Sequence, residues 1–279
     1  MSMAGGELSP AALAFDAVAE GFDGRFGPWL SVAAQRRAIR AAFLRAFPEN
    51  ASLVEIGGGT GDDALWLAER GRQVLLTDAS PAMVGVARAK FSGQAMLKAE
   101  VCAAETFEAF ATTRGEHFDG AYSVFAPLNC VSDLAPFARG LARMLRPGAP
   151  ALLVMFGRCC PGEMITEAVR GRPRNMFRRF ARGDVPARLS GRTFTVRYHG
   201  RADIAAAMAP WFQLRARQGV GVFVPPSAAE PWISAHPRLL GALEGLDRAL
   251  SRPLALFGDH ILYSLTRTDA PAPYAGPRP

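Results

Sequence analysis

Two short segments contain residues whose types and spacing indicate a chemical role. The first is the run Glu55-x-Gly57-x-Gly59-x-Gly61, which lies between a short apolar segment and a helical pattern. Its glycines can adopt positive φ and bring bare backbone against a ligand. A helix that begins directly after such a loop offers unpaired N–H groups to a carboxylate or phosphate. The loop therefore predicts a site for a nucleotide-type ligand.

The second segment is the apolar run 73–78, which ends in Asp78. In doubly wound folds, an acid at the end of the second strand binds ribose hydroxyls. The loop spacing differs from the G-x-G-x-x-G of dinucleotide enzymes. In addition, Glu55 would repel a pyrophosphate but attract a cation. These features disfavour a nicotinamide oxidoreductase. They suit S-adenosylmethionine, which has a ribose, a carboxylate, an ammonium and a sulfonium.

At these residues the chain resembles the class I S-adenosylmethionine-dependent methyltransferases. Residues 55–61 are similar to the first motif of the family, and residues 78–83 to its second. Residues 116–125 resemble the motif around the fourth strand, and residues 141–156 resemble the following helix, turn and fifth strand. The resemblance is dense over residues 51–157 and loose elsewhere.

The resemblance implies S-adenosylmethionine as cofactor and S-adenosylhomocysteine as product. It places Asp78 on the ribose and Met83 near the adenine. The family often has an acid after the third strand, where this chain has Ala103, so the adenine is read either by the backbone or by Glu105. The implied cofactor-binding residues are Glu55, Gly57, Gly59, Gly61, Asp78, Ala79, Met83, Ala103, Ala104, Glu105 and Phe125.

Segments of strand length alternate with helical ones over residues 51–157. The expected strands are 52–56, 73–77, 96–101, 118–124 and 150–156. Such alternation is typical of βαβ units, and right-handed crossovers then place ligands at the carboxyl edge of the sheet. The later helix, strand, helix, strand pattern resembles the antiparallel hairpin that ends the family's fold. The predicted class is α/β, with a Rossmann-like, seven-stranded, mostly parallel sheet and helices on both faces.

The flanking segments complete the predicted organisation. Residues 1–50 predict an N-terminal helical lid that covers the cofactor in the family, or a helix pair that only packs on the sheet. Residues 158–193 predict a helical cap inserted after the fifth strand. Residues 194–269 would then complete the core, and residues 270–279 would form a flexible tail. Eleven arginines but only three acids lie between residues 158 and 201.

Composition narrows the class of protein further. The chain has 279 residues, a net charge of +7 and 49% hydrophobic residues, as expected for one large globular α/β domain or for one domain plus a subdomain. No signal-peptide pattern or apolar run of membrane-spanning length is visible, so we expect a cytoplasmic protein without a membrane partner. The four cysteines have no metal-ligand spacing, and no metal site is expected.

Three residues are candidates for the chemistry of transfer, which is an in-line displacement that depends on holding the nucleophile in place. Phe125 follows the fourth strand and could stack on the sulfonium, or it could be a core aromatic. Asn129 could orient a substrate or cap a helix. His199, after the insertion, is the histidine best placed to act as a base or a substrate contact, although such transfer needs no dedicated base.

The favoured function is methyl transfer to an oxygen, nitrogen or carbon atom of a small metabolic or natural-product molecule. The alternative is a nucleic-acid methyltransferase, because Phe177 and Phe180 are interleaved with arginines as in a phosphate-binding patch. Against this, the N-P-P-Y and D-P-P-Y tetrads of base-amino methyltransferases are absent. A third interpretation is that the arginines bind an anionic substrate. The oligomeric state is left open.

Overall fold

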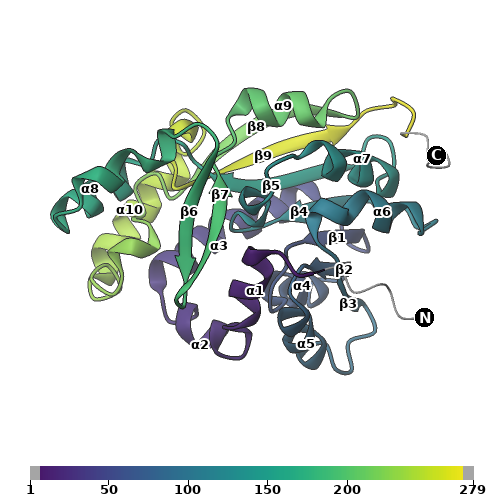
Figure 1. The fold of residues 1–279 in the computed structure, drawn as a ribbon, viewed down its shortest axis with the longest axis horizontal. Coiled ribbons are helices and arrows are strands. Elements are labelled where there is room, and N and C mark those ends of the chain that lie inside the picture. The colour runs from purple at the N-terminus through teal and green to yellow at the C-terminus, as the bar shows by residue number, and fades with distance from the viewer. Residues whose placement is uncertain (1–6, 273–279) are drawn as a thin grey trace.

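The computed structural model describes residues 7–272 and is built on one central sheet (Figure 1). Its strand order is β3-β2-β1-β4-β5-β9-β8. The first five strands run parallel, and β9 runs antiparallel to both of its neighbours. The strands are β1 (Ser52–Ile56), β2 (Gln73–Asp78), β3 (Leu97–Val101), β4 (Gly120–Ser123), β5 (Pro150–Phe156), β8 (Phe212–Val220) and β9 (His260–Arg267).

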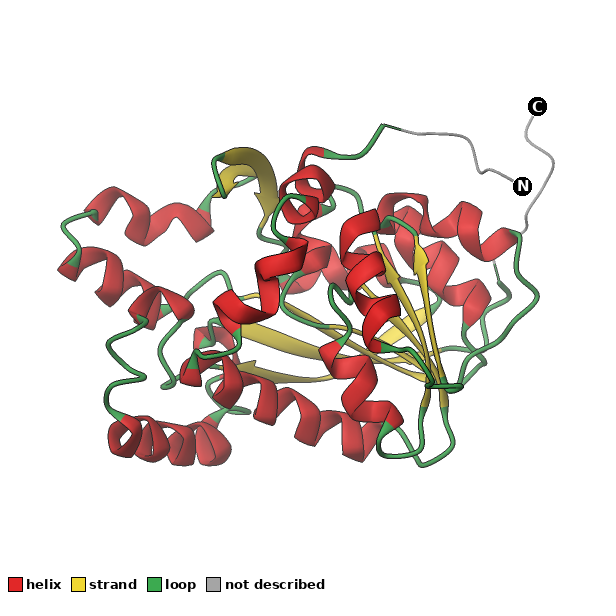
Figure 2. Ribbon diagram, turned by 90° about the horizontal axis from the view of Figure 1, so that it is seen from below, coloured by secondary structure: helices red, strands yellow, loops and turns green. Residues whose placement is uncertain are grey.

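Helices cover both faces of this sheet, as Figure 2 shows. One face packs against α6 (Phe107–Thr112), α7 (Ala135–Met144) and α9 (Arg201–Met208). The other packs against α3 (Leu30–Ala46), α4 (Asp62–Ala68) and α5 (Pro81–Lys90). The remaining helices lie outside these two layers: α1 (Pro10–Asp16), α2 (Phe22–Phe26), α8 (Pro161–Val169) and α10 (Pro237–Leu250).

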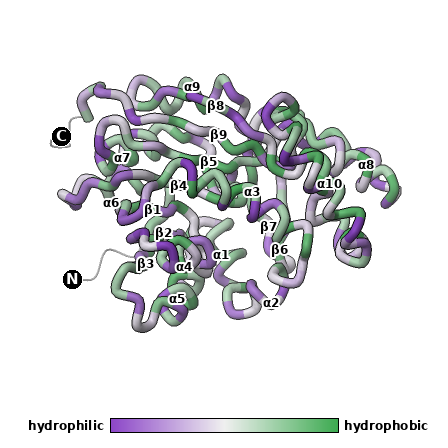
Figure 3. Tube along the Cα trace, turned by 180° about the vertical axis from the view of Figure 1, so that it is seen from behind, coloured by the Kyte–Doolittle hydropathy of each residue, from purple (hydrophilic) through white to green (hydrophobic). Residues whose placement is uncertain are grey.

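Burial on both faces explains why inner parallel strands such as β5 are nearly continuous apolar runs. In β5 every residue from Ala151 to Met155 is buried. Figure 3 shows hydrophobic colour along the central strands and hydrophilic colour on the outer turns. The predicted fold class is confirmed, including the antiparallel end of the sheet. Residues 1–6 of the predicted lid and residues 273–279 of the predicted tail lie outside the described residues.

The insertion after β5 is only partly helical, so the prediction of a helical cap ending at residue 193 was wrong for its second half. Helix α8 and a 3₁₀ segment (Pro173–Phe180) are followed by the antiparallel hairpin β6 (Asp184–Leu189) and β7 (Arg192–Arg197). The hairpin turns at Ser190-Gly191, both with positive φ, as a two-residue hairpin loop requires. More buried and more exposed side chains alternate along its strands. Phe194 and Val196 pack in a small apolar cluster with residues of α1.

A buried arginine ties this insertion to the sheet. Arg179 bonds to Glu163 of α8 and to the Asp259 carboxylate at 2.7 Å. It also donates to the carbonyl oxygens of Gly157 and Asp259, at 3.1 and 2.7 Å. Although burial alone would raise the pKa of Asp259, the neighbouring His260 and the guanidinium of Arg179 lower it well below its usual range. One side chain therefore joins α8 to the ends of β5 and β9.

Because Arg179 holds the insertion on the sheet, its removal should greatly lower the free energy of unfolding. Arg179→Met would leave Glu163 and Asp259 buried without their cation, which typically costs about 3–5 kcal/mol. Urea unfolding of Arg179→Met and of the exposed control Arg174→Met would measure the effect. A free energy of unfolding for Arg179→Met equal to that of the control would contradict the anchoring role.

Candidate functional site

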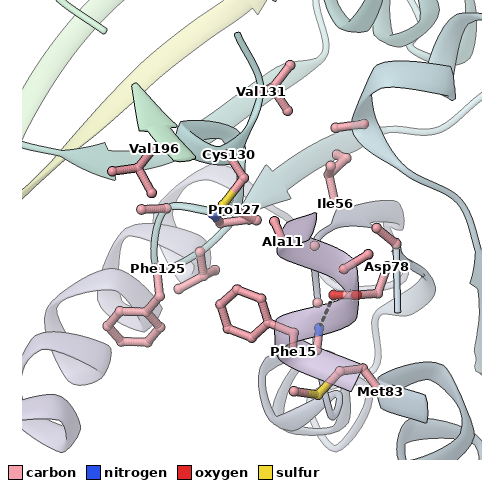
Figure 4. Close-up of a pocket in the computed structure, with 18 of the residues that line it drawn as sticks. Ala11, Phe15, Ile56, Asp78, Met83, Phe125, Pro127, Cys130, Val131 and Val196 are labelled. Atoms are coloured by element: carbon pink, nitrogen blue, oxygen red, sulfur yellow. Dashed lines mark hydrogen bonds between the residues drawn. The ribbon is translucent and has the colours of Figure 1, made fainter. Parts of the chain in front are cut away.

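A cavity of about 410 Å³ opens at the carboxyl edge of the sheet. It lies where the connections from β1 and β4 diverge, which is where ligands bind in open α/β sheets. Residues between Ser9 and Tyr198 line it, and Figure 4 shows Asp78 and Met83 on one side and Phe125 and Val196 on another. The cavity has two continuous parts, which differ in charge.

The first part, here the loop half, is formed by the ends of β1, β2 and β3. Its lining residues are Glu55, Ile56, Gly57, Gly58, Gly59, Thr60, Asp62, Asp63, Asp78, Ala79, Met83, Cys102, Ala104 and Glu105. Gly57, Gly59 and Gly61 have φ values of 67°, 55° and 84°. Side chains resist that region, so the turn needs glycine. Gly61 itself does not line the cavity; a Cβ there would lie 2.6 Å from the ring of Phe91.

Asp78 is held in place by backbone groups on both of its oxygens. Its Oδ2 accepts from the N–H of Gly59 at 2.9 Å, and its Oδ1 accepts from the N–H of Ser80 at 2.9 Å. Figure 4 draws one of these bonds as a dashed line. Burial raises the pKa of Asp78, although both N–H groups favour its ionised form. Each oxygen retains acceptor capacity, so the carboxylate can receive hydroxyl donors from the cavity.

Glu55 is a buried carboxylate without a complete set of partners. Its side chain is only 2% exposed, and Oε2 has no hydrogen bond among the described residues. Burial, followed by repulsion from Asp63, raises the pKa of Glu55 well above its usual value. Such an orphaned acid in a cavity wall favours a ligand that supplies a cation or a hydrogen-bond donor.

The N-terminal helices are fastened over the loop half by two aspartates. Asp16 at the end of α1 accepts from Ser80 Oγ and the Ala82 N–H at the start of α5, both at 2.8 Å. Asp23 of α2 accepts from Thr60 Oγ1 at 2.6 Å and pairs with Lys90 at 2.5 Å. The adjacent Phe15 and Phe22 both line the cavity. This segment therefore forms one wall.

Phe125 lies between the two halves of the cavity, in the left-handed region with φ 56°. The guanidinium of Arg36, from α3, is 5.2 Å from its ring centroid. Arg36 also bonds to Asp62 at 2.8 Å and lies 3.7 Å from Asp63. One face of Phe125 thus already contacts a cation, and its ring forms part of the cavity wall.

The second part, here the insertion half, is apolar inside and positively charged at its mouth. Its lining residues are Cys130, Val131, Phe156, Arg178, Ala187, Arg188, Phe194, Val196 and Tyr198. Phe156 lies 5.9 Å from Tyr198, centroid to centroid, and stacks on the buried His260 at 4.8 Å. Burial raises the pKa of Tyr198 and that of Cys130, the latter to about 12. Both groups are therefore neutral at physiological pH.

Neither polar side chain predicted for the transfer step lines the cavity. His199 is buried, and its Nε2 donates to the carbonyl of Val131 at 2.8 Å. Burial lowers the pKa of His199. Asn129 is completely buried; its Nδ2 donates to the Arg197 carbonyl at 2.6 Å, and its Oδ1 accepts from the Phe156 N–H at 3.0 Å. Asn129 caps no helix and instead joins the hairpin to the end of β5.

Most of the predicted cofactor residues do line the cavity; Gly61 and Ala103 do not. Sequence reasoning missed Arg36 and the aromatic wall of Phe156, Phe194 and Tyr198. A signal for the wall was present: two alternating segments separated by Ser190-Gly191 are typical of a hairpin. No local signal marks Arg36, because α3 reaches the cavity only through tertiary packing.

Comparison with known proteins fits this geometry. Residues 53–148 match a family model described as a methyltransferase domain. A search of curated protein sequences finds no match. A protein from Listeria monocytogenes assigned as an S-adenosylmethionine-dependent methyltransferase has a similar structure, with 14% identity, a TM-score of 0.58, and coverage of 85% of this chain and 98% of that one.

Two further solved structures are similar. The DhpI complex with S-adenosylmethionine and a ligand designated HEP has 17% identity and a TM-score of 0.54, covering 95% of this chain and all 100% of that chain. A protein described for the conversion of a disulfide bond into a thioacetal group during echinomycin biosynthesis has 20% identity and a TM-score of 0.51, covering 83% and 82%. At these identities the likeness concerns the fold.

Residues 53–148 thus form a class I methyltransferase domain. This domain supports S-adenosylmethionine-dependent methyl transfer, with S-adenosylmethionine as the cofactor. Over residues 7–272, no three His, Cys, Asp or Glu side chains are grouped as metal ligands. Within the same range, no helix is both long enough and apolar enough to cross a membrane.

The burial of Glu55 predicts a pH-dependent effect on stability. Because its pKa is raised in the folded state, ionisation opposes folding, and this cost appears as the pH rises above the usual carboxyl pKa. Glu55→Gln should therefore stabilise the ligand-free protein at neutral pH by about 1–3 kcal/mol, the usual cost of an unsatisfied buried polar group.

The gain should vanish in acid, where Glu55 is protonated in both states. Unfolding by urea across a pH series would measure this gain in stability. The control is Glu105→Gln, which changes an exposed residue of the cavity. A gain for Glu55→Gln that does not change with pH would show that charge is not its cause.

Proposed function

We propose that this enzyme methylates a small molecule enclosed in the insertion half of the cavity. The main observation is that this half is continuous with the loop half and closed by α1 and the hairpin. The whole cavity, about 410 Å³, lies within the range of small-molecule sites, which is roughly 300–1,000 Å³. Such a space suits a metabolite-sized acceptor more than a nucleic-acid strand.

The residues of the loop half fit the cofactor. We propose that Asp78 binds the ribose hydroxyls and that Met83, Ala104 and Glu105 surround the adenine. The orphaned Glu55 faces the cationic amino-acid portion, which would supply the positive charge that its burial lacks. These proposals combine the family resemblance with the acceptor capacity and burial of each group.

When bound, S-adenosylmethionine supplies the methyl group. The protein's part in the reaction, as we propose it, is to exclude water and hold the acceptor in line. Phe125 stands at the junction of the two halves, where it can separate the reacting centre from Arg36. His199 and Asn129 act on the backbone around the cavity rather than on the acceptor. Positioning alone can supply several kcal/mol of the barrier reduction.

Two of the similar structures agree with a small-molecule acceptor. One holds a second ligand, HEP, besides S-adenosylmethionine, and the other belongs to echinomycin biosynthesis. A nucleic-acid substrate is the second candidate, because Phe177 and Phe180 are exposed on a segment rich in arginine. Exposed aromatics beside cations can stack on bases. The insertion would then bind RNA outside the cavity.

Removing the carboxylate of Asp78 should weaken cofactor binding. Asp78→Ala is expected to lower the affinity for S-adenosylhomocysteine by about 1.5–3 kcal/mol, the range for hydrogen bonds to charged groups. Isothermal calorimetry would measure the change, with Asp78→Asn as a milder variant and Glu116→Ala as a surface control. Unchanged affinity in a folded Asp78→Ala variant would remove Asp78 from the cofactor site.

The class of acceptor can be tested by following the methyl group. The protein would be incubated with methyl-labelled S-adenosylmethionine and a cell extract separated by size into metabolites, RNA and protein. We expect the label in the metabolite fraction, and we expect Arg172→Gln/Arg174→Gln, which changes two exposed arginines outside the cavity, to leave the rate unchanged. Label in RNA that depends on these arginines would favour the second candidate.

A further inference from the structure

Charge is distributed unevenly between the two halves of the cavity. Arg36, which also lines it beside Phe125, is paired with Asp62 at 2.8 Å and lies 3.7 Å from Asp63. The acids that line the cavity, Glu55, Asp62, Asp63, Asp78 and Glu105, all belong to the loop half. None of the described residues that line the insertion half is acidic, whereas Arg178 and Arg188 are cationic. A molecule lying across the cavity therefore meets negative potential at one end and positive potential at the other.

The two arginines at the mouth keep donors available. Arg188, on β6, forms no ion pair or side-chain hydrogen bond with any described residue. Arg178 uses only its Nε, which donates to Glu163 Oε1 at 2.8 Å, and its side chain is 44% exposed. Its terminal nitrogens are unengaged within residues 7–272. Five N–H donors in a planar fork match a carboxylate or phosphate.

The wall between these arginines and the loop half is apolar and aromatic. Phe156, Phe194 and Tyr198 form it, and Phe15 of α1 packs 6.0 Å from Phe194. Arg179 lies behind Phe156, 5.0 Å from its ring, but its donors are all committed to the anchor. Among the described lining residues, Arg188 at the mouth is the cation without an acidic partner, and Arg178 beside it keeps free donors. The interior offers burial for a ring or a hydrocarbon body.

We propose that the acceptor is an amphipathic anion: its apolar or aromatic body, which carries the nucleophile, lies against Phe156, Phe194 and Tyr198, and its carboxylate or phosphate binds Arg178 and Arg188 at the mouth. This inference rests on the proposed function and adds the substrate class and orientation. The anionic group is held at the end of the cavity remote from Glu55 and Asp78, which would repel it. The nucleophile then points toward the loop half.

Binding of simple probes to the protein saturated with S-adenosylhomocysteine tests this orientation. The probes are hydrocinnamate, its neutral amide, phenylpropylamine and phenethyl phosphate, and calorimetry measures each. We expect the two anions to bind about five- to tenfold more tightly than the amide, as for two partly exposed ion pairs, and the amine to bind least. The better of the two anions identifies carboxylate or phosphate as the group.

Variants assign the effect to the arginines. Arg188→Gln and Arg178→Gln should each remove most of the anion preference, whereas the matched control Arg192→Gln, on the same hairpin outside the cavity, should keep it. Added salt should reduce the preference. Equal binding of amide and anion, no binding of any probe, or an equal loss in the control overturns the inference. If S-adenosylhomocysteine itself fails to bind, the proposed function fails first, and this inference falls with it.

Discussion

The opposite directions taken by the chain after β1 and β4 are the constraint on which the site depends. Parallel strands need crossover connections, and these are right-handed, so helices that leave β1 and β4 cover opposite faces of the sheet. The adjacent carboxyl ends therefore have no helix between them. The glycine loop after β1, Asp78 after β2 and Phe125 after β4 all meet there. Tight packing on both faces keeps these strand ends fixed.

The acids of the loop half fall into two groups, those with a cation partner and those without one. The difference bears on which nucleotide can bind. Asp62 and Asp63 are neutralised by cations from other elements, including Lys90 at 2.7 Å and Arg40 at 2.7 Å. Glu55 and Asp78 are left without a cation partner among the described residues. A pyrophosphate would meet uncompensated negative charge there, whereas a sulfonium or ammonium would relieve it. The charge arrangement thus supports the choice that the loop spacing alone suggests.

The sequence predicted the parts of the protein that depend on local patterns. The strand, glycine turn and helix around Gly57, and the acid that ends β2, follow from spacing and residue type within one βαβ unit. The hairpin carried its own signal at Ser190-Gly191, but the arginine-rich composition around it favoured a helical cap. Arg36 could not be assigned to the site, because α3 approaches it only in the folded chain. Phe156, in contrast, ends a predicted parallel strand and could have been placed at the same sheet edge. Asn129 and His199 were predicted as candidates for the transfer step, yet tertiary hydrogen bonds direct both side chains to the backbone.

The two halves of the cavity are supported by separate sets of contacts. Asp16 and Asp23 join the N-terminal helices to the cofactor loops, whereas Arg179 joins the insertion to the carboxyl end of β5 and the start of β9. Substitutions in the hairpin can therefore reshape the acceptor wall without disturbing Asp78 or the glycine turn. The match to the methyltransferase family model is accordingly confined to residues 53–148, which hold the loop half, while most residues that line the insertion half lie outside that range. The acceptor must be inferred from the chemistry of the insertion itself.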